Sequence, residues 1–189
     1  MINTYIPYFK KKDQNILNQC LKTNFVSTAG PLVKKFQEKF CKKYSFKYSV
    51  AVNSGTSALH LGLKALGVNK GDSVILPSYT FVVSAMAILA AGLKPIFVDI
   101  EENTGQLSTS SVERFLGNEK LERNKIVAVM PVSPFGAKID KEIWSEFSSK
   151  HKLEVVYDEA WCFDSFVPSS KGASALSLHA TKPFYIPQL

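Results

Sequence analysis

Two residues in the second half of the chain are of types that enzymes use for covalent and acid–base chemistry. Lys182 follows the strand-like stretch 175–179. A lysine in a partly desolvated site has a lowered pKa and can form an imine with a carbonyl compound. Asp158 directly follows the largely apolar stretch 153–157, and a buried carboxylate is costly without a partner. A single lysine is more often a surface residue, and Asp158 could cap the next helix. We favour functional roles because of the groups that accompany them.

A helix N-terminus in the first half of the chain is suited to binding an anion. Gly55, Thr56 and Ser57 follow the apolar stretch 48–53 and open a helical stretch. Free N–H groups and the helix dipole at such a terminus attract phosphate. Simple N-capping by Ser54 or Thr56 explains the same residues equally well.

An aromatic side chain follows another predicted strand. Phe81 comes just after the stretch 73–78, together with Tyr79 and Thr80. Its ring could pack into the core or stack on a flat ligand. A phosphate cradle, a flat aromatic ring, a carboxylate and an imine-forming amine are together the groups that a pyridoxal phosphate site needs.

The apolar pattern predicts strands and helices that alternate along most of the chain. Helical spacing is present at 12–22, and a second helix is predicted to open after the turn 29–31. Strands are predicted at 48–53, 73–78, 94–100, 125–132, 153–158 and 175–179, with helices starting near Ser54, Thr80, Ser110 and Ile143. This alternation favours a parallel sheet covered on both faces, in one α/β domain over residues 1–189. Right-handed crossovers bring the carboxyl ends of the strands to one edge, where ligands bind.

Composition and charge exclude several classes of function. The formal charge of +7 comes from lysines spread along the chain. Basic residues do not alternate with aromatic ones, so nucleic acid is a poor candidate partner. Cys20, Cys41 and Cys162 are far apart and lack zinc spacing, which favours a reducing cytoplasm and no metal site. The longest apolar run, 81–93, is too short to span a bilayer, and no signal peptide is recognisable. We expect a cytoplasmic protein without a membrane partner.

Three stretches strongly resemble the DegT/DnrJ/StrS family of sugar aminotransferases. They are residues 53–101, 155–161 and 177–182, which occur in the family's order. The resemblance extends over nearly the whole chain and implies the large domain of a fold-type-I pyridoxal phosphate transferase. Such a domain has a mostly parallel sheet with helices on both faces.

The resemblance also implies a role for each candidate residue. Lys182 matches the lysine that forms an imine with the cofactor, and Asp158 matches the acid at the pyridine nitrogen. Phe81 matches the aromatic residue that stacks on the cofactor ring. The residues that match the phosphate-binding groups are Gly55, Thr56, Ser57 and Ser177.

Family members transfer an amino group from glutamate to a keto sugar that is usually linked to a nucleotide, often for amino-sugar or surface-polysaccharide biosynthesis. One branch carries histidine in place of the lysine and catalyses other sugar chemistry, so Lys182 indicates the transaminase branch. The resemblance further implies a homodimer, because a second subunit completes the family's active sites.

The chain departs from the family pattern in three places. In the first, Glu159 stands where alanine is common, and Trp161 stands where many members carry a polar residue near the cofactor's phenolic oxygen. The second is the segment between Asp158 and Ser177, which is shorter than in many relatives. After Lys182 the family continues through a glycine-rich turn, a further strand and a small domain, none of which follows before Leu189. We therefore expect a partial large domain, incomplete at the C-terminus, that binds cofactor weakly alone. A catalytically inactive partner subunit and an inert product are the alternatives to an enzyme.

Overall fold

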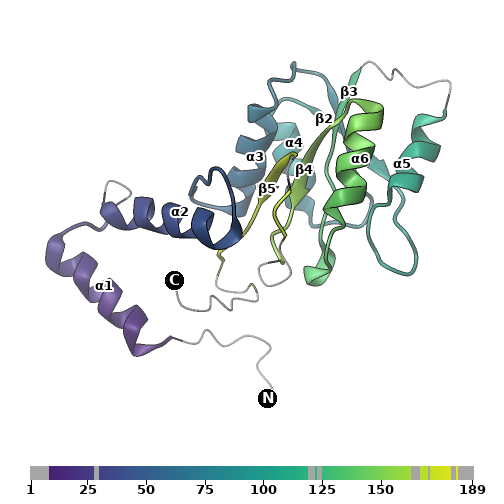
Figure 1. The fold of residues 1–189 in the computed structure, drawn as a ribbon. Coiled ribbons are helices and arrows are strands. Elements are labelled where there is room, and N and C mark those ends of the chain that lie inside the picture. Colours follow the sequence, from purple (N-terminus) through teal and green to yellow (C-terminus); the bar gives the residue numbers. More distant parts are fainter. Residues whose placement is uncertain are drawn as a thin grey trace. The chain divides into compact units, whose positions relative to one another are not determined.

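The computed structural model describes residues 9–27, 30–118, 122, 125–162, 167–169, 171–179 and 182. They fall into two compact units, one with the described residues up to Ala51 and the other from Val52 onward (Figure 1). All the predicted site residues lie in the second unit. Within the described ranges, no helix has both the length and the apolar character that crossing a membrane requires.

The first unit contains the two helices that the sequence predicts. Helix α1 (Lys11–Thr23) buries none of its residues, whereas α2 (Pro31–Tyr44) buries Phe40. Helix α2 begins at Pro31, whose fixed φ and missing N–H suit the first helical position. The ring of Phe40 lies 4.8 Å from that of Tyr44 and 5.8 Å from that of Phe46, between ring centroids. A small aromatic cluster therefore stabilises the C-terminal half of α2.

The second unit is built on a five-stranded sheet in which every strand is parallel to its neighbours, as predicted. The strand order is β2-β1-β3-β4-β5. The strands are β1 (Ser73–Pro77), β2 (Lys94–Val98), β3 (Ile126–Val129), β4 (Glu154–Asp158) and β5 (Ala173–Ala175). All five residues of β1 are buried, which is typical of a central strand with both faces covered.

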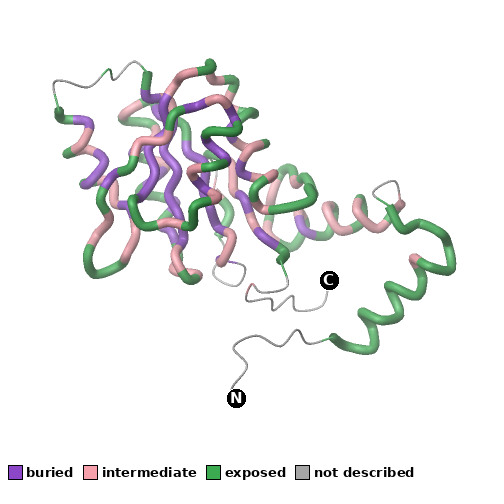
Figure 2. Tube along the Cα trace, turned by 180° about the vertical axis from the view of Figure 1, so that it is seen from behind, coloured by how far each residue is buried: buried purple, intermediate pink, exposed green. Residues whose placement is uncertain are grey.

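Helices cover both faces of this sheet (Figure 1). Helices α3 (Gly55–Ala65) and α4 (Val82–Ala90) pack on one face, where Leu63, Leu76 and Ile88 form part of one core. Helices α5 (Thr109–Leu116) and α6 (Lys141–His151) pack on the other face, over a second core. Ile75 belongs to the second core and its neighbour Leu76 to the first, because successive side chains of a strand point to opposite faces. Figure 2 shows buried residues along the strands.

The predicted strand at 48–53 is wrong, because this stretch is not part of the sheet. Tyr48 and Val50 are 75% and 66% exposed. The carbonyl of Ser49 accepts a hydrogen bond from the side chain of Gln37 on α2, at 2.7 Å. Strand-type residues form a strand only where another strand supplies hydrogen-bond partners, and no described strand pairs with these residues.

The predicted strand at 175–179 is also corrected. Strand β5 spans Ala173–Ala175 and ends two residues before Ser177. The hydroxyl of Ser177 accepts a hydrogen bond from the backbone N–H of His179 at 3.3 Å. Such local side-chain-to-backbone bonds compete with sheet pairing. Ser177 is buried and His179 is exposed, so the two do not share a face as a strand would require.

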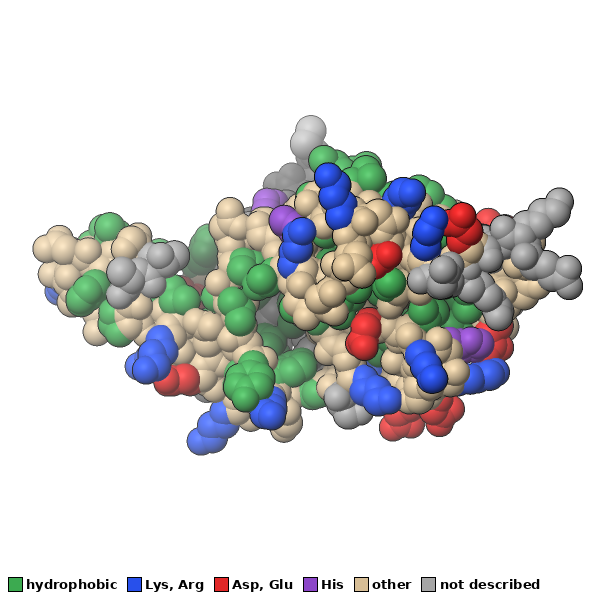
Figure 3. All heavy atoms as spheres, turned by 90° about the horizontal axis from the view of Figure 1, so that it is seen from above, with side chains coloured by type: hydrophobic (Ala, Val, Ile, Leu, Met, Phe, Trp, Pro, Cys, Tyr) green, Lys and Arg blue, Asp and Glu red, His purple; other side chains and the backbone are tan. Residues whose placement is uncertain are grey.

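Charged side chains are dispersed over the described surface. On the face that Figure 3 presents, Lys and Arg side chains are interspersed with acidic ones. This arrangement is typical of a solvated surface.

Candidate active site

Asp158 is the last residue of β4 and lies buried at the carboxyl end of the sheet, with 6% of its surface exposed. Its Oδ2 accepts a hydrogen bond from the hydroxyl of Ser84 at 2.7 Å, and its Oδ1 accepts one from the N–H of Ala160 at 3.2 Å. Burial raises the pKa of Asp158, and these hydrogen bonds and the charge of Lys182 oppose that rise. A buried carboxylate held by two neutral donors favours a cation as a further partner.

Ser84 is a site residue that sequence reasoning missed. It is fully buried on α4, and its hydroxyl lies 2.9 Å from the hydroxyl of Thr80. The available signal was a lone serine that interrupts the apolar run 81–93, since a polar group in an apolar helix needs a buried partner. That partner, Asp158, is 74 residues further along the chain.

Lys182 lies within electrostatic reach of Asp158. Burial lowers the pKa of its amine, the direction that the sequence predicts, and the charge of Asp158 opposes this effect. Its backbone N–H donates to the carbonyl of His179 at 2.9 Å. Its ammonium lies over the ring of Trp161, with Nζ 3.9 Å from the ring centroid. The amine and the carboxylate singled out from the sequence therefore act on each other in the folded chain.

The N-terminus of α3 has the serine cap that the sequence left open as one alternative, and it also has N–H groups that the cap does not use. Ser54 caps the helix, because its hydroxyl accepts a hydrogen bond from the N–H of Ser57 at 3.1 Å. Among the described residues, the N–H groups of Gly55 and Thr56 have no hydrogen-bond acceptor. A Cβ on Gly55 would lie 3.3 Å from the Cβ of Ser177. Free donors at a helix N-terminus beside a serine hydroxyl fit a phosphate group.

Phe81 does not pack into the core, the alternative that the sequence left open. It is the N-cap residue of α4 and is 70% exposed. Its backbone carbonyl accepts a hydrogen bond from the N–H of Ser84 at 3.0 Å, and the Ser84 hydroxyl binds Asp158. The first turn of α4 therefore connects an accessible aromatic ring to the buried carboxylate.

Sequence comparison identifies the family. The model of the DegT/DnrJ/EryC1/StrS aminotransferase family matches residues 7–186. The chain belongs to this family.

Individual relatives agree with this assignment. The chain is 36% identical over 171 residues to GDP-perosamine synthase of Escherichia coli O157:H7. This match covers 90% of the chain and 44% of that protein. The chain is 36% identical over 137 residues to EpsN of Bacillus subtilis strain 168, which is described as a pyridoxal phosphate-dependent aminotransferase. This match covers 71% of the chain and 35% of EpsN. The chain therefore spans less than half the length of these relatives.

A solved structure shows the same fold. The sugar aminotransferase Spr1654 of Streptococcus pneumoniae, in its PMP form, aligns with a TM-score of 0.82 at 24% identity. The alignment covers 97% of this chain and 49% of that protein. The parallel sheet flanked by helices is thus an incomplete fold-type-I α/β domain, as predicted.

Glu159, at a position where alanine is common in the family, forms a buried ion pair. Its Oε2 lies 2.7 Å from the Nζ of Lys141 on α6, and the two side chains are 2% and 5% exposed. The same Nζ donates to the hydroxyl of Ser174 at 3.0 Å and lies 4.8 Å from the centroid of the Tyr157 ring. This cluster lies on the α6 side of the sheet, whereas Asp158 faces α4. It joins α6, the end of β4 and β5.

Three aromatic side chains are aligned at the carboxyl edge of the sheet. The ring of Phe135 lies 6.3 Å from that of Tyr79 and 6.4 Å from that of Trp161, between centroids. Phe135 has a left-handed backbone with φ 50°, which is uncommon for a bulky residue and often marks a functional segment. No motif or apolar pattern in the sequence points to Phe135.

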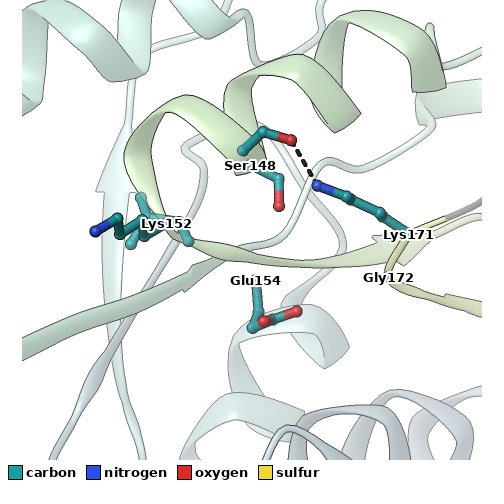
Figure 4. Close-up of a pocket in the computed structure, with 7 residues that line it drawn as sticks. Ser148, Lys152, Glu154, Lys171 and Gly172 are labelled. Carbon is teal, nitrogen blue, oxygen red and sulfur yellow. Dashed lines mark hydrogen bonds between the residues drawn. The ribbon is translucent and has the colours of Figure 1, made fainter.

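A separate hollow lies at the opposite edge of the sheet (Figure 4). Its lining includes Lys152 at the end of α6, Glu154 at the start of β4, and Lys171 and Gly172 before β5. None of the predicted site residues borders it. Ligands of open parallel sheets bind at the carboxyl edge, so we place the candidate site beside Asp158.

Within the described part of the chain, no group of three or more His, Cys, Asp or Glu side chains could hold a metal ion.

Proposed function

We propose that residues 1–189 belong to the large domain of a pyridoxal phosphate-dependent aminotransferase and supply its cofactor site. The observation that carries the proposal lies at the carboxyl edge of the sheet, where the buried carboxylate of Asp158 is held by Ser84 and its charge acts on the amine of Lys182. Groups whose pKa values are shifted by burial and by each other are concentrated at functional sites.

The residues present fit the cofactor group by group. The unpaired N–H groups at the start of α3 and the hydroxyl of Ser177 would hold the phosphate. The exposed ring of Phe81 would stack on the pyridine ring. Asp158 would pair with the protonated ring nitrogen, the cation that a buried carboxylate of raised pKa favours. When bound, the cofactor supplies an electron sink for the carbon that loses a proton.

The chain's own groups would handle the protons. Ser84 and the N–H of Ala160 would orient the Asp158 carboxylate, so that it keeps a proton on the ring nitrogen. Lys182 would take the proton from the amino donor's carbon and return it, since a lysine of lowered pKa can act as a base near neutral pH.

We propose glutamate as the amino donor and a keto sugar linked to a nucleoside diphosphate as the acceptor. The GDP-perosamine synthase relative supports this substrate class, and the product would serve amino-sugar or surface-polysaccharide synthesis. We also propose a homodimer in the cytoplasm. Three free cysteines are compatible with that reducing compartment.

The first test asks where the cofactor attaches. The chain is incubated with pyridoxal phosphate, reduced with borohydride and digested, and the pyridoxyl label is located by mass spectrometry. We expect the label on Lys182 and none at this position in Lys182→Arg, which keeps the positive charge. Labelling spread over surface lysines, with equal total incorporation in the variant, would refute the assignment.

The second test asks for the reaction. Residues 1–182 are joined to the part of the Escherichia coli relative that follows its matched segment. Transfer of ¹⁵N from glutamate to a GDP-linked keto sugar is then measured. We expect transfer by the parent chimera and a loss of at least a thousandfold in Lys182→Arg. A folded chimera that carries cofactor on Lys182 but transfers no nitrogen to any nucleotide-linked keto sugar would exclude the proposed substrate class.

A further inference from the structure

The lysine amine at the candidate site lies against the face of a tryptophan. The Nζ of Lys182 is 3.9 Å from the centroid of the Trp161 ring. A cation within about 6 Å of a ring centroid is attracted by the negative face of the ring, and tryptophan is the most effective ring. Lys182, the lysine singled out for chemistry, makes this contact.

The backbone around Trp161 fixes the position of its ring. The residue lies in a turn after β4, in which the N–H of Cys162 donates to the carbonyl of Glu159 at 3.0 Å. In the same turn, the N–H of Ala160 donates to the carboxylate of Asp158. The turn that carries the ring therefore starts at the carboxylate that acts on Lys182.

A second segment supports the turn from outside. The backbone of Gly136 approaches Trp161 so closely that a Cβ there would lie 3.1 Å from the Trp161 carbonyl oxygen. The ring of Phe135 lies 6.4 Å from the Trp161 ring. Both residues have positive φ, which glycine adopts readily but which is costly for Phe135 unless its surroundings hold it. Residues 135 and 136 therefore contact both the backbone and the ring of Trp161.

Burial acts on the charge of the Lys182 amine in one direction, and two neighbouring groups act on it in the other. Burial disfavours its charge, and Asp158 is the one charged group among the described residues that counteracts burial. The negative face of the indole ring is a second source of stabilisation for the ammonium. Both lie on the same short segment, 158–161, so one turn presents a carboxylate and a ring face to the amine.

We propose that Trp161 is a positioning residue for Lys182, and that its ring face holds the ammonium beside Asp158 while the amine is not engaged in chemistry. The importance of this contact rests on the proposed function, which makes Lys182 the catalytic amine. The contact itself exists in the chain without any ligand. The contact holds the flexible four-carbon side chain of Lys182 near Asp158, whose charge compensates that of the amine.

The test measures the titration of Lys182 in the full chain without cofactor. Lysines are reductively methylated with ¹³C-formaldehyde, and the Lys182 signal is assigned as the one that Lys182→Arg lacks. The midpoint of its chemical-shift titration is then compared between the parent chain and Trp161→Leu, which keeps apolar bulk but removes the ring face. Trp161→Phe restores a smaller ring, and Phe135→Leu removes the neighbouring ring that does not contact Lys182.

We expect the Lys182 midpoint in Trp161→Leu to fall by roughly half to one and a half pH units, as the strength of cation–π contacts implies. Trp161→Phe should recover part of this fall, and Phe135→Leu should match the parent. Equal midpoints in the parent and in both Trp161 variants would overturn the proposal, as would an equal fall in Phe135→Leu. Because Trp161→Phe preserves the shape of the turn, it decides the matter even if Trp161→Leu unfolds.

This outcome is separable from that of the proposed function. If the pyridoxyl label does not appear on Lys182 while the midpoint still depends on the Trp161 ring, the cofactor assignment fails and the positioning role stands. If the label appears and the midpoint is independent of the ring, the positioning role fails alone.

Discussion

Gly55 at the start of α3 faces Ser177, two residues beyond β5, so closely that a Cβ on the glycine would lie 3.3 Å from the Cβ of the serine. This contact brings the free N–H groups of the helix N-terminus next to a buried serine hydroxyl. Separation of the two segments by even a few tenths of an ångström would disturb that set of donors. The absence of a side chain at Gly55 is therefore part of the candidate phosphate site.

Gly55→Ala should weaken cofactor binding more than it affects folding. The added methyl must push Ser177 away, so we expect roughly tenfold weaker binding of pyridoxal phosphate, or about 1.4 kcal/mol. The free energy of unfolding should change by less than about 1 kcal/mol, since alanine favours helix over glycine. Binding is followed by absorbance titration and unfolding by urea denaturation.

Gly62→Ala, on the same helix, is the matched control. A Cβ there would meet Val156 and Ala173 at ordinary distances of 3.5 and 3.6 Å. This substitution should leave cofactor binding unchanged. Parent-like affinity in Gly55→Ala would remove Gly55 from the proposed phosphate site.

Asp158 should destabilise the chain that lacks cofactor at neutral pH. Burial raises the pKa of the folded-state carboxyl above its unfolded value, so between those two values the folded state binds more protons and stability falls as pH rises. Asp158→Asn should therefore unfold at higher urea concentration than the parent at pH 7. The gain is about 1.4 kcal/mol for each pH unit by which the pKa is raised.

The difference should shrink as pH falls toward the unfolded-state pKa near 3.9, because below that value the carboxyl is neutral in both the folded and the unfolded state. Urea denaturation of both proteins from pH 4 to pH 8 measures it. A gap that stays constant with pH would mean that the carboxyl is not titrating as its burial implies. The same variant should lose most aminotransferase activity in the chimera, a trade-off between stability and function that active sites commonly show.

Ser84 should be essential for keeping Asp158 ionised. Removal of its hydroxyl leaves one carboxylate oxygen without its buried donor, and hydrogen bonds to charged groups contribute about 1.5–3 kcal/mol. We expect Ser84→Ala to lower the free energy of unfolding by that amount at pH 7. In the Asp158→Asn background the same substitution should cost less, because the charge is gone. Equal costs in the two backgrounds would show that Ser84 only fills space.

Much of the fold could be predicted from the sequence because the central strands are buried on both faces. A continuous apolar run such as Ser73–Pro77 has few other stable placements, and its five residues are all buried. The stretch 48–53 has the same kinds of residue but is not a strand. Composition describes what a strand needs from its own residues. It does not say whether a neighbouring strand is present to pair with it.

Some residues of the candidate site could be predicted from the sequence and others could not. Lys182 and Asp158 could be found because a lysine and a carboxylate after apolar stretches require an explanation from local sequence. Lys141 and Phe135 could not, because their importance depends on partners that only the fold brings near. Ser84 was visible only as a polar residue in an apolar run, and the sequence did not identify its partner. Ser84 meets Asp158 across 74 residues, and Lys141 meets Glu159 across 18.

The buried pair of Lys141 and Glu159 should be strongly coupled, which supplies the last prediction. Burial lowers the pKa of Lys141 and raises that of Glu159, and the charge of each opposes the effect on the other. Removal of one partner leaves an uncompensated buried charge, so Lys141→Met or Glu159→Leu should each cost about 3–5 kcal/mol at pH 7. The double variant should lie much closer to the parent, because well-packed apolar side chains can replace a buried ion pair.

Lys150→Met provides the comparison, since Lys150 pairs with Glu113 on the surface, where the side chains are 67% and 39% exposed. It should cost less than about 1 kcal/mol. Urea denaturation of the parent, the two single variants and the double variant gives the coupling energy between Lys141 and Glu159. Hydrogen exchange at the N–H of Glu159, which donates to the carbonyl of Ala175 at 2.9 Å, reports whether β5 separates from β4. We expect faster exchange in each single variant and slow exchange in the double variant. Single and double variants that lose stability additively would show that the pair does not hold β5 in register.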